Sequence, residues 1–518
     1  MWRSIRQSLG RVLLLVSAIA LNAPRGMAGD GQDPRPTQLP LPTHELAETR
    51  VTPVDLQHAM IDTAGQSVRS IPPAQLEPAE KPLPINLTTA LRLAGASPLV
   101  ISTAQAGVAA ASAELDRAKA LWLPSVYVGA GYYRHDGSTM GQSGNFYINS
   151  KDQFMAGGGL KALVSASDAL FAPLAARQVL RARQMDVQTA RNEALFSVAQ
   201  AYFNVQRARG RLTGAQDVVD KGTALAEKVR GLKLGQVAPT DVNRARALLA
   251  DLEQTVDLDR EAWRTASADL TQVLRLDFSA TVVPLEPPFL QVRMFPPGTP
   301  VDVLIPIGLT NRPELASQQA LVQVALVRIR QERLRPLVPS LVLQGEPGAV
   351  GPGGYLMGGV FASGASGQGN PPTGREDIGV GLVWGLENLG FGNRALVRTR
   401  QAEQQQLLLD LFRIQDQVAG DIARAHAQVE SAASRVGKAE RGLSEAQAAY
   451  MGGIQHLGEV IPLGDAKVVL DRTLDVVSSI QALSRAYDNY FGSINDLNIA
   501  QFRLYRALGY PADMLSVP

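Results

Sequence analysis

A regular spacing of small and apolar residues runs through the chain between Pro173 and Pro239. From Val198 onward such positions recur in alternating steps of three and four, at Val198, Ala201, Val205, Ala208, Leu212, Ala215, Val219, Gly222, Ala226 and Val229. This heptad seam indicates a helix in a left-handed coiled coil. The proline-free stretch 174–234 predicts a helix roughly 90 Å long at about 1.5 Å per residue. A helix of that length is too long for one globular core, so we expect the other elements to lie along it or at its ends.

A second seam follows a short turn at 235–240. It consists of Val242, Ala245, Leu249, Leu252, Val256, Trp263, Ala266, Leu270 and Val273. Asp259 stands where this seam expects an apolar residue. Because the turn is short, the predicted helices 174–234 and 240–276 are antiparallel neighbours.

Before the long helix the period changes from 3.5 to two. Val126, Val128, Ala130 and Tyr132 alternate with Tyr127, Gly129, Gly131 and Tyr133. Alternation of this kind predicts a strand near 126–134. A polar, glycine-rich loop follows at 136–150, and a return strand is expected near 154–164, so that 125–166 forms a strand hairpin.

The same order of features then returns. Pro98 and Pro124 are 26 residues apart (124 − 98), as are Pro313 and Pro339 (339 − 313), and each second proline precedes a serine and an alternating stretch. The later copy predicts a strand hairpin at about 340–386 and helices 393–452 and 465–508. The offset of the copies, 215 residues (313 − 98), is too long for a solenoid repeat. We therefore predict two structural repeats, 85–280 and 301–511.

The segments outside the repeats are of other kinds. Residues 1–28 resemble a secretory signal peptide, with Arg3, Arg6 and Arg11 before a short apolar run and small residues before the expected cleavage after Ala28. Residues 29–84 contain ten prolines and are predicted to be an extended segment. A proline-rich linker occupies 281–300, and 512–518 form a C-terminal tail.

Composition limits the possible chemistry. The chain has 518 residues, a net charge of +2 and no cysteine. It therefore has no disulfides or thiolate sites, and no strongly basic face for nucleic acid. The five histidines are scattered without metal-ligand spacing, and the glycine clusters do not form a phosphate loop. We expect no enzyme activity, cofactor or metal site.

Several short motifs, in their order and spacing, resemble the TolC family of outer-membrane efflux proteins. They are Asn311-Arg312-Pro313-Glu314-Leu315, the helix-to-strand junctions Leu123-Pro124-Ser125 and Val338-Pro339-Ser340, Asp241-Val242-Asn243-Arg244-Ala245-Arg246, and Leu504-Tyr505-Arg506-Ala507-Leu508-Gly509-Tyr510. The resemblance covers about 85–511. It implies a mainly α fold with a transmembrane β-barrel. Long antiparallel coiled-coil helices would form an α-helical barrel, and four strands per protomer would complete a 12-stranded barrel in a homotrimer.

The resemblance also implies a function. The protein would be the outer-membrane channel of a tripartite efflux or type I secretion system, in contact with outer-membrane lipid, a periplasmic adaptor and an inner-membrane pump. The alternative is a periplasmic coiled-coil spacer or adhesin without a pore. The cargo stays open between drugs, metal ions and secreted polypeptides. Many relatives carry a lipidated N-terminal cysteine, which this chain lacks.

Two groups of residues are candidate sites. The first is a periplasmic gate and adaptor contact at the helix tips, made of Gly235, Pro239, Thr240, Asp241, Arg244, Gly453, Leu463, Gly464 and Asp465. Asp241 and Asp465 are expected to begin the second helix of each pair, either capping it or facing the pore as an acidic ring. The second group is an aromatic membrane girdle made of Tyr127, Tyr132, Tyr133, Phe146, Tyr147 and Phe154; the alternative is a soluble sheet.

Overall fold

We analysed a computed structural model of the chain. It describes residues 54–55, 59–61, 72–78, 80–96, 99–231, 238–295, 298–344, 346–347, 355–356, 358–365, 368–369, 371, 373–376, 379–458, 460–463, 466–469, 473–510 and 515–516. The chain divides into two units, Met1–Thr52 and Pro53–Pro518, and every described residue belongs to the second. The predicted signal peptide therefore lies outside the described residues.

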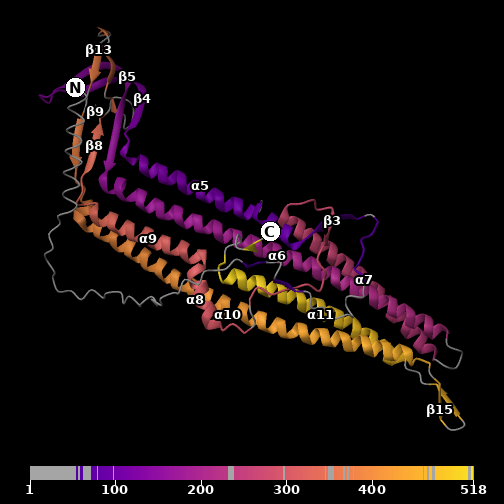
Figure 1. The fold of residues 1–518 in the computed structure, drawn as a ribbon. Coiled ribbons are helices and arrows are strands. Elements are labelled where there is room, and N and C mark those ends of the chain that lie inside the picture. Colours follow the sequence, from indigo (N-terminus) through magenta and orange to yellow (C-terminus); the bar gives the residue numbers. More distant parts are fainter. Residues whose placement is uncertain are drawn as a thin grey trace. The chain divides into compact units, whose positions relative to one another are not determined.

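The first repeat contains one long helix and two shorter ones. After α4 (Leu87–Ala96) and α5 (Leu99–Lys119), a 3-10 turn at Ala120–Trp122 leads into β4 (Ser125–Met140) and β5 (Phe146–Ser165). Then come α6 (Ala166–Gly231) and α7 (Pro239–Leu274). Helices α5 and α7 both pack along α6 (Figure 1), and their 21 and 36 residues sum to 57, against 66 in α6.

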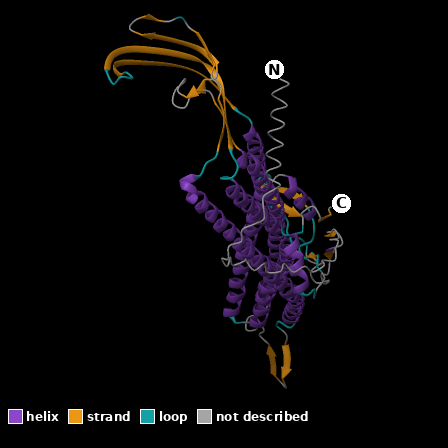
Figure 2. Ribbon diagram, turned by 90° about the vertical axis from the view of Figure 1, so that its left-hand side faces the viewer, coloured by secondary structure: helices purple, strands orange, loops and turns teal. Residues whose placement is uncertain are grey.

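The second repeat has the same plan. Helices α8 (Val301–Asn311) and α9 (Pro313–Leu334) precede the strands, which are followed by α10 (Phe391–Gln455) and α11 (Thr473–Ala507). Here α9 and α11 pack along α10, and their 22 and 35 residues also sum to 57, against 65 in α10. The internal duplication is thus present in the fold. The strands lie at one end of the helices, and the hairpin β15 (Val460–Leu463) and β16 (Ala466–Val469) lies at the other (Figure 2).

The four helices of the tip half form a layer in the order α7–α6–α11–α10. Helix α6 packs against α7 and α11, and α10 packs against α11 (Figure 1). Toward the strands, α6 packs against α5 and α9 instead, and α9 against α10. Helix α6 therefore has neighbours on several sides, and its predicted seam is buried at every position except Val219, which is half-buried.

Glycines of α6, in and beside its seam, allow large side chains to approach. A β-carbon at Gly210 would lie 2.6 Å from the Phe491 ring, and one at Gly214 would lie 2.7 Å from the Tyr487 ring. One at Gly222 would lie 2.9 Å from Leu252. These glycines are thus positions where large side chains of α7 and α11 pack closely against α6.

Residues 72–85, in the segment predicted to be extended, pack against the helices and pair with the linker. Ala74 is buried, and its N–H donates to Thr213 Oγ1 of α6 at 3.0 Å. Strand β3 (Lys81–Ile85) pairs in parallel with β6 (Ala280–Pro284) of the predicted linker. The shorter strands β2 (Met60–Ile61) and β1 (Val54–Asp55) pair with β7 (Gln291–Val292) and β17 (Leu515–Ser516). The described prolines of this segment, from Pro72 to Pro84, occupy edge-strand and loop positions, where a missing N–H is tolerated.

Two of the family-like motifs meet in space. Gly509 ends α11 with a positive φ of 71°, and a β-carbon there would lie 2.8 Å from the backbone of Asn311 and Arg312. Arg312 is buried and pairs with Glu314 at 3.2 Å and Asp421 at 3.0 Å. The motif around Asn311 and the closing motif around Gly509 therefore form one joint between α8, α9, α10 and α11.

Several boundaries differ from those expected. Pro173 lies inside α6, which begins at Ala166, and α10 continues past Gly452 to Gln455. Strands β4 and β5 extend through most of the expected loop at 136–150. The glycine-rich stretch after 345 also contains strands: β9 (Glu346–Pro347), β10 (Tyr355–Leu356), β11 (Gly358–Ala365), β12 (Gln368–Gly369) and β13 (Thr373–Glu376). Pairing along a hairpin supports polar and glycine-containing strands that local propensity disfavours.

One helical stretch among the described residues, Leu87–Trp122, is long and apolar enough to cross a membrane by length and composition. It consists of α4, α5 and the 3-10 turn, and both helices pack along α6. Within α4 the residues buried are Leu87, Ala90, Leu91 and Ala94. The stretch is therefore part of the helical bundle.

A charged layer crosses the bundle at the one polar position of the α7 seam. Asp259 is buried, and its carboxylate lies 3.1 Å from the guanidinium of Arg211 on α6. The same guanidinium lies 2.9 Å from Asp488 of α11. Burial raises the pKa of Asp259 to about 6, against the lowering effect of Arg211 and with a further raising effect of Asp488. Since the folded pKa lies above the unfolded value, stability from this group is complete below the unfolded pKa and is lost as the pH rises through 6.

We therefore expect acidification from pH 7 to pH 5 to stabilise the wild type relative to Asp259→Asn by roughly 1 to 1.5 kcal/mol. Thermal unfolding of both proteins across this pH range measures the difference, and other titrating groups cancel in the comparison. Asp269→Asn, on an exposed position of the same helix, is the control and should leave the pH dependence unchanged. A difference that stays constant from pH 5 to pH 7 would contradict the assignment.

Candidate functional site

Seven described strands, β4, β5, β8 (Ser340–Gln344), β11 to β13 and β14 (Gly379–Val383), form one antiparallel sheet of four ribbons. Strand β4 pairs with β5 along its length, and the other side of β5 pairs with β8 near the helices and with β11 farther out. Strand β14 pairs with β8, and β13 pairs with β11. The outer edge of β4 and the outer edges of β13 and β14 have no partner among the described residues. One chain therefore forms an open sheet.

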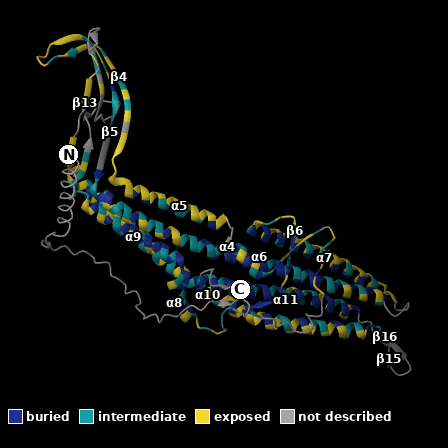
Figure 3. Cartoon of the chain, turned by 45° about the horizontal axis from the view of Figure 1, so that its top comes forward, coloured by how far each residue is buried: buried dark blue, intermediate teal, exposed yellow. Residues whose placement is uncertain are grey.

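One face of the β4–β5 hairpin is apolar and uncovered. Side chains alternate between faces, and the register places Tyr132 opposite Phe154 and Ala130 opposite Ala156. Val126 and Val128, on the same face as Tyr132, are 70% and 86% exposed (Figure 3). The apolar face ends at Arg134, whose Nε donates to Asp136 at 2.7 Å. A bare apolar face with a polar end is typical of strands that contact lipid.

The register divides the predicted aromatic girdle between the two faces. Tyr132 and Phe154 share the apolar face, and Phe146 lies on that face at the far end of the hairpin. Tyr133 and Tyr147 lie on the opposite face, as does the backbone position of Tyr127. The five residues whose side chains are described are all exposed. A single lipid-facing belt can thus contain at most three of the six, because adjacent strand residues point to opposite faces.

A second apolar cluster lies where helices meet strands, and the sequence analysis missed it. Its members, all exposed, are Leu121, Trp122, Leu123, Leu337, Trp384, Leu386, Leu389 and Phe391. Leu389 is 90% exposed and has a positive φ of 58°, between Asn388 at 50° and Gly390 at 88°. The turn is held by Asn393 Oδ1, which accepts from the Glu387 N–H at 2.9 Å. The two tryptophans beside strand ends are the signal that sequence reasoning could have used.

The first helix tip is formed by the end of α6 and the start of α7. Pro239 stands in the first turn of α7, and Pro239 and Thr240 are exposed. Asp241 is buried, and its carboxylate accepts from Arg244 at 2.6 Å. The N-cap residue is Ala238, without a side-chain cap, and Asp241 stands in the first turn of α7, where its charge complements the positive helix end. Gly235 lies outside the described residues.

The second tip differs from the first. Gly453 lies inside α10, where an added β-carbon would come 3.2 Å from Val476 of α11. Leu463 pairs with Ala466 in the β15–β16 hairpin, and α11 begins only at Thr473. The expectation that Asp465 opens the last helix is therefore wrong; Gly464 and Asp465 lie outside the described residues. The missed signal is the pair of apolar segments Val460-Ile461-Pro462-Leu463 and Ala466-Lys467-Val468-Val469, separated in the sequence by Gly464-Asp465.

Two polar contacts join the helix pairs near the tips. Lys228 of α6 donates to the backbone carbonyl of Ile454 of α10. Farther from the tip, the Tyr487 hydroxyl donates to Asp217 of α6 at 2.8 Å and accepts from Gln447 of α10 at 3.1 Å. Burial, together with the Asp217 charge, raises the pKa of Tyr487 above its usual range, so the hydroxyl keeps its proton. These bonds would have to break if the pairs move apart.

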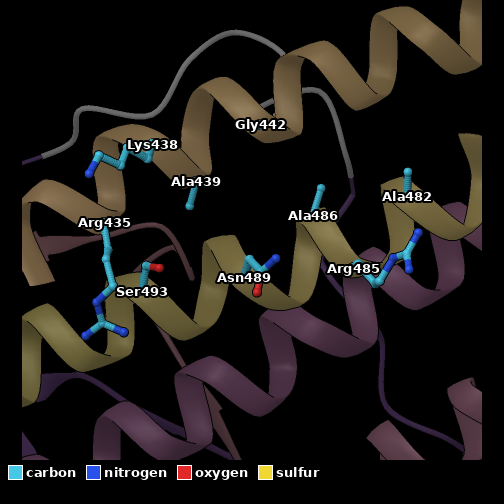
Figure 4. Close-up of a pocket in the computed structure, with 9 residues that line it drawn as sticks. All are labelled: Arg435, Lys438, Ala439, Gly442, Ala482, Arg485, Ala486, Asn489 and Ser493. Carbon is cyan, nitrogen blue, oxygen red and sulfur yellow. The ribbon is translucent and has the colours of Figure 1, made fainter.

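A cavity of about 460 Å³ lies between α10 and α11. Its floor includes Ala439, Gly442, Ala482 and Ala486, and Arg435, Lys438 and Arg485 surround it (Figure 4). Arg435 pairs with Asp496 at 2.9 Å. No group of three or more histidine, aspartate or glutamate side chains is placed to hold a metal ion in the part of the chain that the structure describes.

Comparisons with known proteins agree with this geometry. The family model described as "Outer membrane efflux protein" matches residues 91–274. No curated protein sequence matches the chain.

Solved structures share the fold at low identity. The Campylobacter jejuni CmeC outer membrane channel has a TM-score of 0.62 and 14% identity, covering 83% of this chain and 87% of that one. The outer membrane protein VceC from Vibrio cholerae has a TM-score of 0.62 and 16% identity, covering 82% and 97%. The open state of the Neisseria gonorrhoeae MtrE outer membrane channel has a TM-score of 0.61 and 17% identity, covering 82% and 89%.

The two comparisons complement each other, because the family model matches the first repeat and the shared fold extends over both repeats. We conclude that residues 91–274 match the outer membrane efflux protein family model and that the chain shares, over both repeats, the fold of solved outer membrane channels.

Proposed function

We propose that three copies of this chain form one continuous duct of an efflux or type I secretion system. Four strand ribbons from each copy would close a 12-stranded barrel (4 × 3) in the outer membrane, and the helix pairs would close an α-helical barrel in the periplasm. Cargo would pass down this duct without chemistry in the chain itself. An inner-membrane pump and a periplasmic adaptor would supply the cargo and the energy.

The open sheet is the observation that carries this proposal. Within lipid, unpaired backbone N–H and C=O groups cost several kcal/mol each, so a sheet with two free edges cannot stand alone in a membrane. A bacterial transmembrane barrel needs about eight strands or more, and one chain supplies four ribbons. Closure therefore needs further copies, and the family's channel architecture supports three.

The cluster at the helix–strand junction supports a defined position relative to the membrane. Trp122 and Trp384 stand beside strand ends, and aromatic side chains of this kind favour the headgroup region. Leu386, Leu389 and Phe391 add apolar surface at the same level. We assign this cluster to the periplasmic surface of the outer membrane, where it would help to anchor a protein that has no cysteine for lipidation.

The helix tips are the proposed periplasmic mouth and adaptor contact. They lie at the end of the helices opposite the strands (Figure 2). The contacts Lys228–Ile454 and Tyr487–Asp217 hold the two helix pairs of one protomer together near this end. We propose that the mouth is closed at rest and that the adaptor opens it by moving one pair relative to the other. Asp241 is buried against Arg244, which argues against an acidic ring of that residue at the pore.

In mild detergent the purified protein should have the mass of three chains by light scattering with the detergent contribution removed, and it should give discrete conductance steps in planar bilayers. Closure of the sheet edges is the physical reason for both results. A monodisperse monomer in detergent, or a protein that stays soluble without detergent, would support the spacer or adhesin alternative instead.

Lipids brominated near the headgroup should quench the fluorescence of Trp122 and Trp384 but not that of Trp263, which is 1% exposed. In vesicles, Trp384→Phe should lower the quenched fraction of the processed chain from about two thirds to about one half, because it leaves one interfacial tryptophan beside the buried Trp263. Trp263→Phe is the matched control and should raise that fraction. Equal quenching in all three proteins would argue against the membrane position assigned to the junction.

A covalent link between the two tips should hold the mouth closed. Thr240 and Gln455 are exposed residues on α7 and α10, and the absence of native cysteine makes Thr240→Cys/Gln455→Cys a specific pair. After cross-linking with reagents of increasing length, we expect the resting conductance to persist and the adaptor-stimulated increase to fall at least about tenfold with the shortest reagent that reacts. Each single-cysteine variant, treated alike, should respond normally. Full stimulation of the cross-linked channel would place the gate elsewhere.

A further inference from the structure

The four-helix layer of one protomer has two free edges, α7 and α10. In the tip half α7 packs against α6 and α10 against α11, and the outward sides of both helices are exposed (Figure 3). We propose that these edges bind each other between neighbouring copies in one register, in which Arg441 of α10 pairs with Glu261 of α7 and Leu258 of α7 packs between Ser444 and Ala448 of α10. This inference rests on the trimer proposed above and specifies its interface.

Helix α10 carries a second seam on its outward side. Exposed residues recur in strict alternation of three and four, at Ser434, Gly437, Arg441, Ser444, Ala448, Met451 and Gln455. The buried seam of the same helix, at Val436, Leu443 and Tyr450, points the opposite way into α11. A heptad seam exposed along six helical steps indicates a further helix as its partner.

Helix α7 carries a matching stripe. Its exposed outward positions are Ala247, Ala250, Gln254, Leu258, Glu261, Thr265 and Ala268, again in steps of three and four. They lie opposite the buried positions Leu248, Leu252, Asp259 and Trp263. Most members of both stripes are small, so two helix backbones can approach closely. Leu258 is the large apolar member on α7, with 56% exposure, and Met451 is the large apolar member on α10, with 62%.

Contacts within the protomer fix the relative height of the two edges. Arg211 contacts both Asp259 of α7 and Asp488 of α11, so these two residues lie at one level. Helices α10 and α11 are antiparallel; the Gln447–Tyr487 bond therefore places residue 488 level with 446, and the Arg435–Asp496 pair places it level with 443. Residue 259 of α7 is thus level with 443–446 of α10. Since α7 is antiparallel to α10, Glu261 is level with 441–444, within about one helical turn of Arg441.

In a cyclic oligomer, residues at equal height on the two free edges come to lie next to each other. A ring closed by rotation alone moves a residue around the axis without moving it along the axis, so the α7 edge of one copy meets the α10 edge of the next at the same level. By the same offset Leu258 is level with residues 444–447, next to the small residues Ser444 and Ala448. The one large apolar residue in the middle of the α7 stripe thus faces small residues on α10.

Charges at this level are complementary. The basic residues beside Glu261 already have partners, since Arg264 pairs with Glu80 at 2.6 Å and with Glu77 at 2.8 Å, and Arg260 pairs with Glu77 at 3.2 Å. Glu261 has no ion pair among the described residues, and the Arg441 side chain donates to its own helix at the Gly437 carbonyl. Within the described part of the chain, an acid and a base without ionic partners therefore lie at the same height on the two free edges, which favours a second copy over an unrelated partner.

A charge swap tests the register. Glu261→Arg and Arg441→Glu should each lower the temperature at which the detergent-solubilised trimer dissociates by roughly 5 °C, because like charges then face each other at three interfaces. The double variant Glu261→Arg/Arg441→Glu should recover most of that loss. Glu253→Arg, an exposed acid of α7 outside the stripe, is the matched control. It should change the dissociation temperature little, and Glu253→Arg/Arg441→Glu should show no recovery.

A second measurement does not depend on stability. Leu258→Cys/Ser444→Cys should oxidise to covalent dimers and trimers on non-reducing gels, whereas each single variant should stay monomeric there. If the wild type is a trimer but the charge swap shows no recovery and the cysteine pair gives no ladder, the register is wrong and the duct still stands. If the wild type is a monomer, the proposed function fails first.

Discussion

The unpaired edges of the sheet and of the helical layer need partners, and this chain has such edges at the strand end and at the tip end of its helices. In lipid the requirement is strong, because the backbone groups of β4 and of β13 and β14 have no water to replace a missing strand. In the tip half it is weaker and rests on side chains, since α7 and α10 expose stripes of small residues. The sheet edges and the helix edges belong to one covalent chain. In the proposed ring, the same rotation between neighbouring copies therefore has to pair both kinds of edge. The length of α6 and α10 makes this demanding, because a small error in tilt at the strands grows along 66 and 65 residues.

Polar contacts at intervals are how the helices keep their register over such a length. Small residues permit many sliding positions that bury nearly the same area, so apolar packing alone specifies the alignment weakly. Arg211 between Asp259 and Asp488, and Tyr487 between Asp217 and Gln447, are each satisfied in one alignment. The glycines at 210, 214 and 222 add steric registration, because Phe491, Tyr487 and Leu252 fit only where no β-carbon stands. Stability and alignment thus come from different residues of the same seam.

The sequence was most informative where a single period persists. Steps of three and four predicted α6 and α7, and the repeated order of features predicted α10 and a last helix that overlaps α11. It was least informative where the partner is distant in sequence. Strands such as β11 and β13 are glycine-rich and form because a neighbouring ribbon supplies hydrogen bonds. The proline-containing segment around Ala74 is ordered by Thr213, 139 residues away.

The candidate sites show the same division. The positions of Pro239 and Thr240 at a helix tip followed from the turn between two seams. The last helix, in contrast, does not begin at Asp465, because the hairpin of Val460–Leu463 and Ala466–Val469 precedes it. The aromatic residues of β4 were found by composition, but their division between two faces depends on the register with β5. The junction cluster needed the fold, since Trp122 and Trp384 are 262 residues apart (384 − 122) and each lies where its repeat changes between helix and strand.

The outward seam of α10 is exposed because no other described helix of the same chain covers it. A helix in a closed ring of helices has two lateral neighbours, so it needs two seams. When one of these neighbours belongs to another copy, only the other seam is buried within a single chain. In α10 the seam at Val436, Leu443 and Tyr450 is rich in large residues, and the one at Gly437, Ser444 and Ala448 is rich in small ones. Small residues bury less area, which suits a contact that has to form late, between finished protomers, without exposing a large apolar surface before assembly. In the proposed ring, the difference in side-chain size between the two seams would therefore separate folding of the chain from assembly of the copies.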